Sequence, residues 1–250
     1  MNCVASDFII PDWDAPTNVH ALVTMRTGGV SAAPWDSFNL GDHVGDAAAA
    51  VTENRRRLRQ HLPAEPFWLK QVHGTQCCDA QVLSSTSNAR LTEADAAFVR
   101  APDVVCAVLT ADCLPVLLCD EAGTVVAAAH AGWRGLAAGV IESTVKSMGV
   151  PGEQLLAWLG PAIGPLNFEV GDEVRTTFVA HDAQATAAFA AQTEGKWLCD
   201  IYLLARQRLA ALGISRTASA DFCTVRDKKR FYSYRRDGTT GRMASLIWRS

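Results

Sequence analysis

Short apolar runs separated by turn residues dominate the middle of the chain. Residues 104–110, 116–119 and 125–129 are almost wholly apolar, and Pro115 lies between the first two runs. Apolar runs of this length, bounded by turn residues, are typical of buried strands. The segment 120–123, Asp-Glu-Ala-Gly, has the composition of a tight turn. The second and third runs are therefore predicted to form a β-hairpin.

The same patterns extend over most of the chain. Further strands are predicted at 19–25, 67–72, 78–83, 96–99, 155–159, 218–225 and 243–248. Helices are predicted from Asp46 to about His61 and at 135–148, 171–181 and 201–212. Asp46 is expected to cap the first helix. The alanine-rich tract 180–191 is expected to be helix and connector rather than a linker between domains.

The balance of these elements predicts the fold class. Strands outnumber helices, and adjacent hairpins favour a mixed sheet over a doubly wound parallel one. We therefore expect an α+β fold with a layered mixed β-sheet core flanked by helices. A chain of 250 residues is one large domain or two small ones. Because no linker interrupts it, a single domain over residues 1–250 is predicted.

Composition narrows the classes of partner. The net charge of −3 provides no attraction for nucleic acid or an anionic membrane surface, and no apolar run reaches membrane-spanning length. Residues 1–13 lack the basic and apolar regions of a secretory signal. With eight cysteines and no such signal, we expect reduced thiols and a cytoplasmic location. The oligomeric state stays open.

Two of the predicted strands bring a cysteine and a histidine to one sheet edge. Cys113 precedes the second run and His130 follows the third, so the hairpin places them near each other. His73, just before Gly74, is a third candidate. Two histidines and a cysteine form a set that zinc accepts, with a fourth position left open for water or substrate. The alternatives from the residues alone are a thiol nucleophile and simple burial of cysteine as a small apolar side chain.

Five sequence blocks carry a family resemblance. In chain order they are Lys70-Gln71-Val72-His73-Gly74, Ala111-Asp112-Cys113-Leu114-Pro115, His130-Ala131-Gly132-Trp133-Arg134-Gly135, Gly160-Pro161-Ala162-Ile163-Gly164 and Tyr234-Arg235-Arg236-Asp237-Gly238. Together they resemble the YfiH/YlmD family, also called the laccase-domain or multicopper polyphenol oxidase family. The resemblance runs from about Thr24 to Ala244.

The resemblance implies a fold and an activity. The fold would be layered sheets with flanking helices, related to the cytotoxic necrotising factor toxins. His73, Cys113 and His130 would hold zinc and form the catalytic centre. The substrates would be a purine nucleoside and phosphate, with phosphorolysis of adenosine or inosine and deamination of adenosine as the leading reactions. The sequence does not rank these two reactions.

Other polar residues in or near the motifs are candidates for the site. Asp112 either orients a ligand or moves a proton, or else it is a turn residue at a strand end. Arginine suits phosphate because its planar fork donates two parallel hydrogen bonds. The candidate substrate contacts are Arg26, Asn39, Arg134 and Arg235, with Arg242 nearby. Surface ion pairing is the alternative for the arginines, and Asn39 can instead fix its own turn. Phe168, Phe231 and Tyr234 could stack on a base, although core packing is the alternative role of each.

Three other functions compete with the zinc enzyme. A multicopper oxidase needs roughly ten histidines for four coppers, and this chain has six. A single copper ion in the zinc site remains compatible with the ligands. A hydrolase acting on a cell-wall precursor, as the family name peptidoglycan editing factor implies, would use Cys113 activated by His130 and would leave His73 without a role. A non-enzymatic binding module is the remaining alternative.

Overall fold

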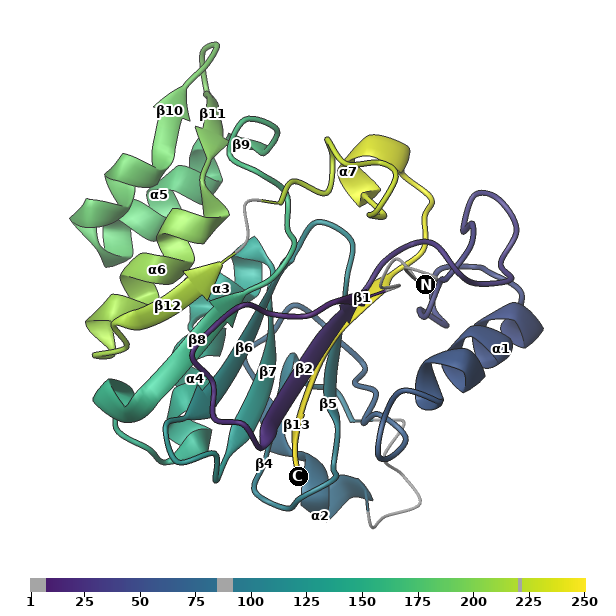
Figure 1. The fold of residues 1–250 in the computed structure, drawn as a ribbon. Helices are drawn as coiled ribbons and strands as arrows, with labels where there is room; N and C mark the ends of the chain where they lie inside the picture. The colour runs from purple at the N-terminus through teal and green to yellow at the C-terminus, as the bar shows by residue number, and fades with distance from the viewer. Residues whose placement is uncertain (1–7, 85–91, 220–221) are drawn as a thin grey trace, which may run out of the picture.

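The computed structural model describes residues 8–84, 92–219 and 222–250, arranged around two central sheets (Figure 1). The larger sheet has six strands. In spatial order they are β12 (Arg216–Ser219), β8 (Leu155–Leu159), β6 (Leu114–Asp120), β7 (Val126–Ala131), β4 (Ala96–Val99) and β3 (Cys77–Asp79). The second sheet has the order β1 (Phe8–Ile9), β2 (Val19–Thr24), β13 (Met243–Arg249) and β5 (Cys106–Thr110).

Helices and a third, small sheet complete the fold. The small sheet has the order β10 (Phe189–Ala191), β11 (Lys196–Cys199) and β9 (Glu169–Gly171). The helices are α1 (Ala48–Arg59), α2 (Ala80–Ser84), α3 (Trp133–Ala138), α4 (Val140–Met148), α5 (Asp172–His181), α6 (Ile201–Ala211) and α7 (Tyr234–Asp237). Short 3-10 turns lie at Gly152–Gln154 and Ala183–Ala188. None of the described helices is long and apolar enough to cross a bilayer.

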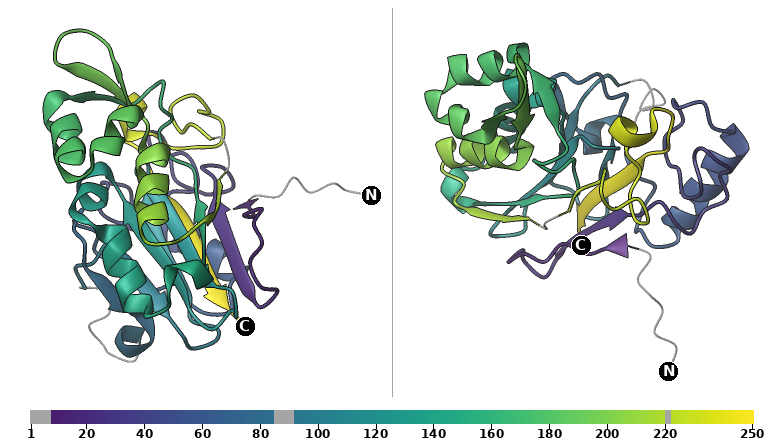
Figure 2. Two further views of the ribbon diagram at one scale, coloured as in Figure 1. Left: turned by 90° about the vertical axis from the view of Figure 1, so that its left-hand side faces the viewer. Right: turned by 90° about the horizontal axis from the view of Figure 1, so that it is seen from above.

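Burial defines a stack of layers. Side chains such as Leu117 of β6 and Ile247 of β13 pack between the two central sheets. The other face of β6, with Leu118, packs against Ile141 of α4 and its neighbours. Helix α1 covers the outer face of the four-stranded sheet through Leu58. Seen from above, α1 and the α5–α6 part lie at opposite ends with the sheets between them (Figure 2).

The β6–β7 hairpin confirms the central prediction from the sequence. The strands pair antiparallel, with Val116 opposite Ala129 and Cys119 opposite Val126. All seven residues of β6 and all six of β7 are buried. Because layers cover both faces, these strands are apolar throughout and do not alternate with polar residues.

Several predicted boundaries were wrong. The helix predicted at 135–148 begins at Trp133 and is divided at Gly139, whose φ of +101° is outside the helical region. Segment 67–72 has only isolated bridges at Phe67 and Lys70, so the predicted strand is absent here and the chain runs on into the loop that carries His73. Segment 78–83 is the end of β3 followed by α2.

The remaining differences concern caps and the third sheet. The strand predicted at 218–225 is β12 at Arg216–Ser219; residues 220–221 lie outside the described residues, and 222–225 form no strand. Asp46 does not cap α1; Ala47 is the N-cap, and the Asp46 carboxylate accepts bonds from Ser31 and Asn39 instead. The tract 180–191 contains the end of α5, a 3-10 turn and β10.

Candidate active site

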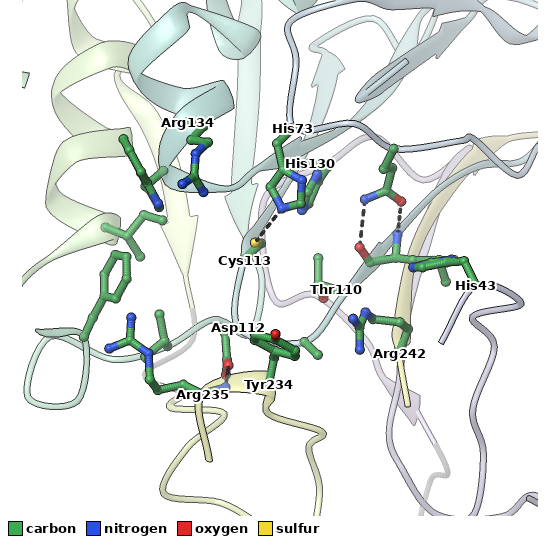
Figure 3. A pocket seen from close by; sticks show the side chains of 17 residues that line it. His43, His73, Thr110, Asp112, Cys113, His130, Arg134, Tyr234, Arg235 and Arg242 are labelled. Atoms are coloured by element: carbon green, nitrogen blue, oxygen red, sulfur yellow. Dashed lines mark hydrogen bonds between the residues drawn. The ribbon is translucent and has the colours of Figure 1, made fainter. Parts of the chain in front are cut away.

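The three predicted ligands converge at one end of the central sheets. His73 lies in the loop before β3, Cys113 in the turn between β5 and β6, and His130 near the end of β7. Their ligand atoms all lie within 4.8 Å of one another. Sγ of Cys113 lies 3.9 Å from Nε2 of His73, and the two imidazole rings lie 4.9 Å apart at 71° (Figure 3). In the described part of the chain, this is the single cluster with metal-binding spacing.

The donor set fits a metal ion. Ligand atoms around tetrahedral zinc are about 3.5 Å apart, given Zn–N and Zn–S bonds of ~2.0–2.3 Å. The observed separations therefore need only a small closure. Gly132 leaves the room for it, because a Cβ there would lie 3.0 Å from Sγ of Cys113 and 3.1 Å from Cδ2 of His73. Imidazole and thiolate suit zinc, and copper is a chemically possible occupant of the same ligands.

Asp95 supports the cluster and was missed by the sequence analysis. Nδ1 of His130 donates to its Oδ1 atom at 2.8 Å, so the Nε2 atom of His130 is the one left for a metal. The carboxylate also accepts the backbone N–H groups of Val72, His73 and Gly74. An acidic residue directly before the apolar strand β4 was the available signal, because a carboxylate buried at a strand start needs partners.

Charge is concentrated on Cys113 and His130. Burial raises the pKa of the Cys113 thiol, but His130 and His73 lower it more, to about 6. Burial lowers the pKa of His130, but the Cys113 thiolate and Asp95 raise it to about 9. By contrast, burial raises the pKa of Cys119, a thiol outside the cluster, to about 12. Without a metal, Cys113 and His130 therefore favour a thiolate–imidazolium pair, which is the form of cysteine that binds metals or attacks as a nucleophile.

The cluster opens into a pocket of about 550 Å³ with a cationic and apolar lining. Its basic side chains are Arg134, Arg235, Arg242 and His43. Its apolar wall includes Trp133, Ile163, Phe168 and Ile201. Figure 3 shows Arg134 on one side of the cluster and Arg242 with His43 on the other. A pocket of this kind suits a ligand with a flat apolar part and an anionic part.

Two of the three pocket arginines, Arg235 and Arg242, are held in place by backbone carbonyls. Nη1 of Arg235 donates to the carbonyl of Glu169 at 2.8 Å, and the guanidinium lies 5.4 Å from the Phe168 ring centroid. Nη1 of Arg242 donates to the carbonyls of Thr240 and Gly241. Within the described residues the Nη2 atoms of Arg235 and Arg242 make no hydrogen bond and can serve a ligand. Arg134 is exposed and stacks 4.4 Å over Trp133.

Asp112 lines the pocket, but both of its carboxylate oxygens are used by the protein. Oδ1 accepts from the Thr224 hydroxyl at 2.5 Å, and Oδ2 accepts from the backbone N–H of Arg235 at 2.7 Å. The residue is buried and has a φ of +98°. Asp112 therefore links the Cys113 turn to α7, and this geometry favours a structural role over proton transfer.

Arg26 and Asn39 do not line this pocket. The Arg26 guanidinium donates to the carboxylate and carbonyl of Asp36 and to the carbonyl of Lys228. Asn39 is fully buried; its Oδ1 accepts the backbone N–H groups of Gly41 and Arg242. Asn39 thus fixes its own turn and the chain beside Arg242. Direct contact of Arg26 or Asn39 with a substrate stays a prediction.

The pocket also contains residues that were not among the candidates from the sequence. His43 lines it although it lies outside the five blocks, and burial, followed by Arg242, lowers its pKa. Gln71 lines it too, with its carboxamide paired to the backbone N–H and C=O of Leu109. Among the aromatic candidates, Phe168 and the exposed Tyr234 line the pocket, whereas Phe231 is fully buried in the core.

Comparison with known sequences identifies the family. The profile described as multi-copper polyphenol oxidoreductase laccase matches residues 20–250. The chain is 56% identical over 242 residues to purine nucleoside phosphorylase PA4543 of Pseudomonas aeruginosa, covering 96% of this chain and 98% of that protein. It is 54% identical over 246 residues to purine nucleoside phosphorylase YfiH of Escherichia coli (strain K12), covering 97% and 99%.

Solved structures agree with this identification. The crystal structure of protein NMB0706 of Neisseria meningitidis has a TM-score of 0.92 at 47% identity, covering 98% of this chain and 99% of that chain. The crystal structure of Bacillus licheniformis YfiH has a TM-score of 0.87 at 29% identity, covering 93% of each chain. The chain therefore belongs to the multi-copper polyphenol oxidoreductase laccase family, and it is similar over nearly its whole length to these YfiH proteins. The predicted family and the α+β fold class are confirmed.

Proposed function

We propose that the chain is a zinc-dependent purine nucleoside phosphorylase. The observation that carries the proposal is a His2Cys cluster at the wall of a pocket that also holds three arginines. The names of its relatives, purine nucleoside phosphorylases, support the same reaction class. The seven cysteines among the described residues are all free thiols, which is compatible with the reducing cytoplasm we propose as its location.

The pocket divides into parts that match the parts of the reaction. The apolar wall with Trp133 and Phe168 offers a surface for a purine. Arg235 and Arg242 offer free Nη2 donors for phosphate, whose oxygens accept charge-assisted hydrogen bonds. Phosphorolysis requires phosphate beside the ribose carbon that becomes cationic as the base leaves. Holding both reactants in one pocket supplies this proximity.

The metal and the chain have separate tasks. Zinc held by His73, Cys113 and His130 would supply a Lewis acid with one open position. Asp95 holds the Nδ1 proton of His130 and so keeps that ring oriented toward the cluster. Burial and Arg242 lower the pKa of His43, which favours the neutral imidazole, and a neutral imidazole can accept a proton from a ligand at the pocket wall.

Adenosine deamination is the second candidate, favoured by the open side of the metal cluster toward the pocket. Zinc deaminases use a nearby carboxylate as general acid and base. Asp112 is the carboxylate that lines this pocket among the described residues, and both of its oxygens already accept hydrogen bonds. Phosphorolysis is therefore the leading reaction.

A thiol hydrolase is the third candidate, because Asp95, His130 and Cys113 are arranged like a catalytic triad. That mechanism does not use His73, although its Nε2 atom lies 3.9 Å from the same sulfur. A metal site accounts for the positions of both His73 and His130 beside the Cys113 sulfur, so we rank the hydrolase lower.

Product analysis tests the proposal. Purified zinc-loaded protein is incubated with adenosine and with inosine, each with and without phosphate, and the products are separated by chromatography. Phosphorolysis yields free base and ribose 1-phosphate only when phosphate is present. Inosine formed from adenosine without phosphate would assign deamination instead. If neither nucleoside changes while the protein cleaves cell-wall peptides, the nucleoside proposal is overturned.

A further inference from the structure

We infer that Asp95 is the positioning residue that sets both histidine ligands at once. This inference rests on the proposed metal site. Asp95 has no exposed surface, lies directly before β4, and touches neither the pocket nor the Cys113 sulfur in the described contacts. Its carboxylate instead bonds the two segments that carry the histidines. It therefore acts through His73 and His130 and is not itself catalytic.

Asp95 fixes His130 through both its side chain and its backbone. Oδ1 accepts the Nδ1–H of His130 at 2.8 Å, and the Asp95 carbonyl accepts the His130 N–H at 2.7 Å. The first bond sets the ring tautomer and rotation, and the second sets the position of the strand that carries the ring. Carboxylates bonded to metal-binding histidines in this way raise the basicity of the ligand nitrogen.

Asp95 also fixes the loop that carries His73. Its oxygens accept the consecutive backbone N–H groups of Val72 at 3.1 Å, His73 at 2.9 Å and Gly74 at 2.6 Å. Consecutive N–H groups that converge on one anion form a nest. His73 has a φ of +60°, a left-handed conformation that is uncommon for residues other than glycine and is stabilised here by hydrogen bonds to the backbone. The charge of Asp95 supplies this stabilisation.

An asparagine at this position separates shape from charge. Asp95→Asn keeps the size of the side chain but replaces one acceptor oxygen by an NH2 donor. In the wild-type protein, four N–H donors face the Asp95 carboxylate. In the variant at least one of these donors would face the NH2 group, so the His130 ring or the His73 loop must shift. We expect a 10- to 100-fold loss of zinc affinity, the usual effect of losing such a partner.

The test measures zinc binding by competition with a chromophoric chelator, using zinc alone as the ligand. Asp120→Asn is the matched control. Asp120 is also a buried carboxylate, and it accepts three hydrogen bonds, from the Thr124 N–H, the Thr124 hydroxyl and the Val125 N–H. It lies in the β6–β7 hairpin, at the end away from His130. We expect comparable losses of thermal stability in both variants but a loss of zinc affinity only in Asp95→Asn. Wild-type zinc affinity in a folded Asp95→Asn protein would overturn the inference.

A second measurement needs neither metal nor activity. In the metal-free wild-type protein, NMR should show a slowly exchanging Nδ1-bound proton on His130, because the hydrogen bond to Asp95 is buried. That signal should be lost in Asp95→Asn and kept in Asp120→Asn. Its absence from the wild-type protein would overturn the inference even if Asp95→Asn failed to fold. If the wild-type protein does not bind zinc but shows this signal, the proposed metal fails while the positioning role of Asp95 stands.

Discussion

Sγ of Cys113 lies 3.9 Å from Nε2 of His73, although the two residues are 40 positions apart in the chain. The contact joins the loop before β3 to the turn that begins β6. His130 comes from β7 and completes the set. Since loops alone would not hold such a contact, the rigid β6–β7 hairpin and the Asp95 carboxylate keep the three ligand atoms together.

Removing the thiolate should remove the metal. Cys113→Ala deletes one of three ligands, so we predict that the purified variant loses most of its zinc, whereas the wild-type protein carries close to one zinc per chain. Elemental analysis of both proteins provides the measurement. Cys77→Ala is the control, since Cys77 is also half-buried but lies outside the cluster. Full zinc occupancy in Cys113→Ala would show that the ligand assignment is wrong.

Zinc should protect Cys113 from alkylation. A metal-bound thiolate is a poor nucleophile toward iodoacetamide, whereas the free thiolate beside His130 is a good one. We predict that activity falls with a strong chelator and returns with zinc. Peptide mapping should find alkylated Cys113 only after chelation. Cys77, whose pKa burial raises to about 11, provides a slow-reacting reference in both states.

The opposite pattern would identify a thiol hydrolase. In that case chelation alone leaves activity unchanged, and iodoacetamide inactivates the metal-free protein. The comparison is decisive because it changes the metal and the thiol separately in the same wild-type chain.

The sequence predicted the site where the ligands lie on strongly patterned strands. The apolar runs around Cys113 and His130 specify a buried hairpin, and a hairpin fixes which residues lie opposite each other. His43 and Asp95 were missed because their roles depend on tertiary contacts. His43 reaches the pocket from a loop, and Asp95 bonds residues 21 to 35 positions away. Contacts between residues that lie far apart in the sequence leave no periodic pattern of hydrophobic and polar positions.

Because tertiary contacts leave no sequence pattern, the sequence also left the roles of several polar candidates open. Asn39, Asp112 and Arg26 lie in or beside motifs, and the sequence made Arg26 and Asn39 candidate substrate contacts while it left Asp112 between proton transfer and a turn. Their hydrogen bonds distinguish these roles, since Asn39 and Asp112 use their oxygens on backbone and hydroxyl donors. Element boundaries failed where a single glycine, such as Gly139, interrupts a continuous helical pattern.

Asp112 should prove structural when its charge is removed. In Asp112→Asn the new residue tolerates the φ of +98° at this position. Its NH2 group, however, leaves the Thr224 hydroxyl or the Arg235 N–H without an acceptor. We predict a loss of about 1–3 kcal/mol in the free energy of unfolding, the cost of one unpaired buried donor. Denaturant unfolding provides the measurement, with zinc content checked in parallel. Wild-type stability combined with lost activity would instead make Asp112 a proton carrier.

Gly132 should be required for the metal site. In Gly132→Ala the new Cβ would lie 3.0 Å from Sγ of Cys113 and 3.1 Å from Cδ2 of His73, so both ligands must move apart. We predict at least a tenfold loss of zinc affinity. Gly164→Ala is the control, because its Cβ would be crowded in the same way, at 3.0 Å from Cβ and 3.1 Å from Sγ of Cys223, which lies outside the cluster. Equal zinc affinities for the two variants would mean that the space at Gly132 is not part of the site.

Arg242 should bind phosphate through its geometry and not only through its charge. Arg242→Lys keeps the positive charge but loses the planar fork, of which Nη1 is held by the Thr240 and Gly241 carbonyls and Nη2 can serve a ligand. We predict that kcat/KM for phosphate falls by roughly 10- to 150-fold, corresponding to about 1.5–3 kcal/mol for a charged hydrogen bond. Zinc content should not change.

Steady-state kinetics over a phosphate titration measure this effect. Arg216→Lys is the matched control, since Arg216 pairs with Glu121 at 2.9 Å and does not line the pocket. Arg26→Lys tests the remaining prediction from the sequence in the same assay. If the phosphate dependence changed in Arg26→Lys and not in Arg242→Lys, the phosphate would lie near Arg26 and the division of the pocket proposed above would be wrong. A loss confined to Arg242→Lys would place phosphate beside the metal cluster, where the attack on the ribose carbon requires it.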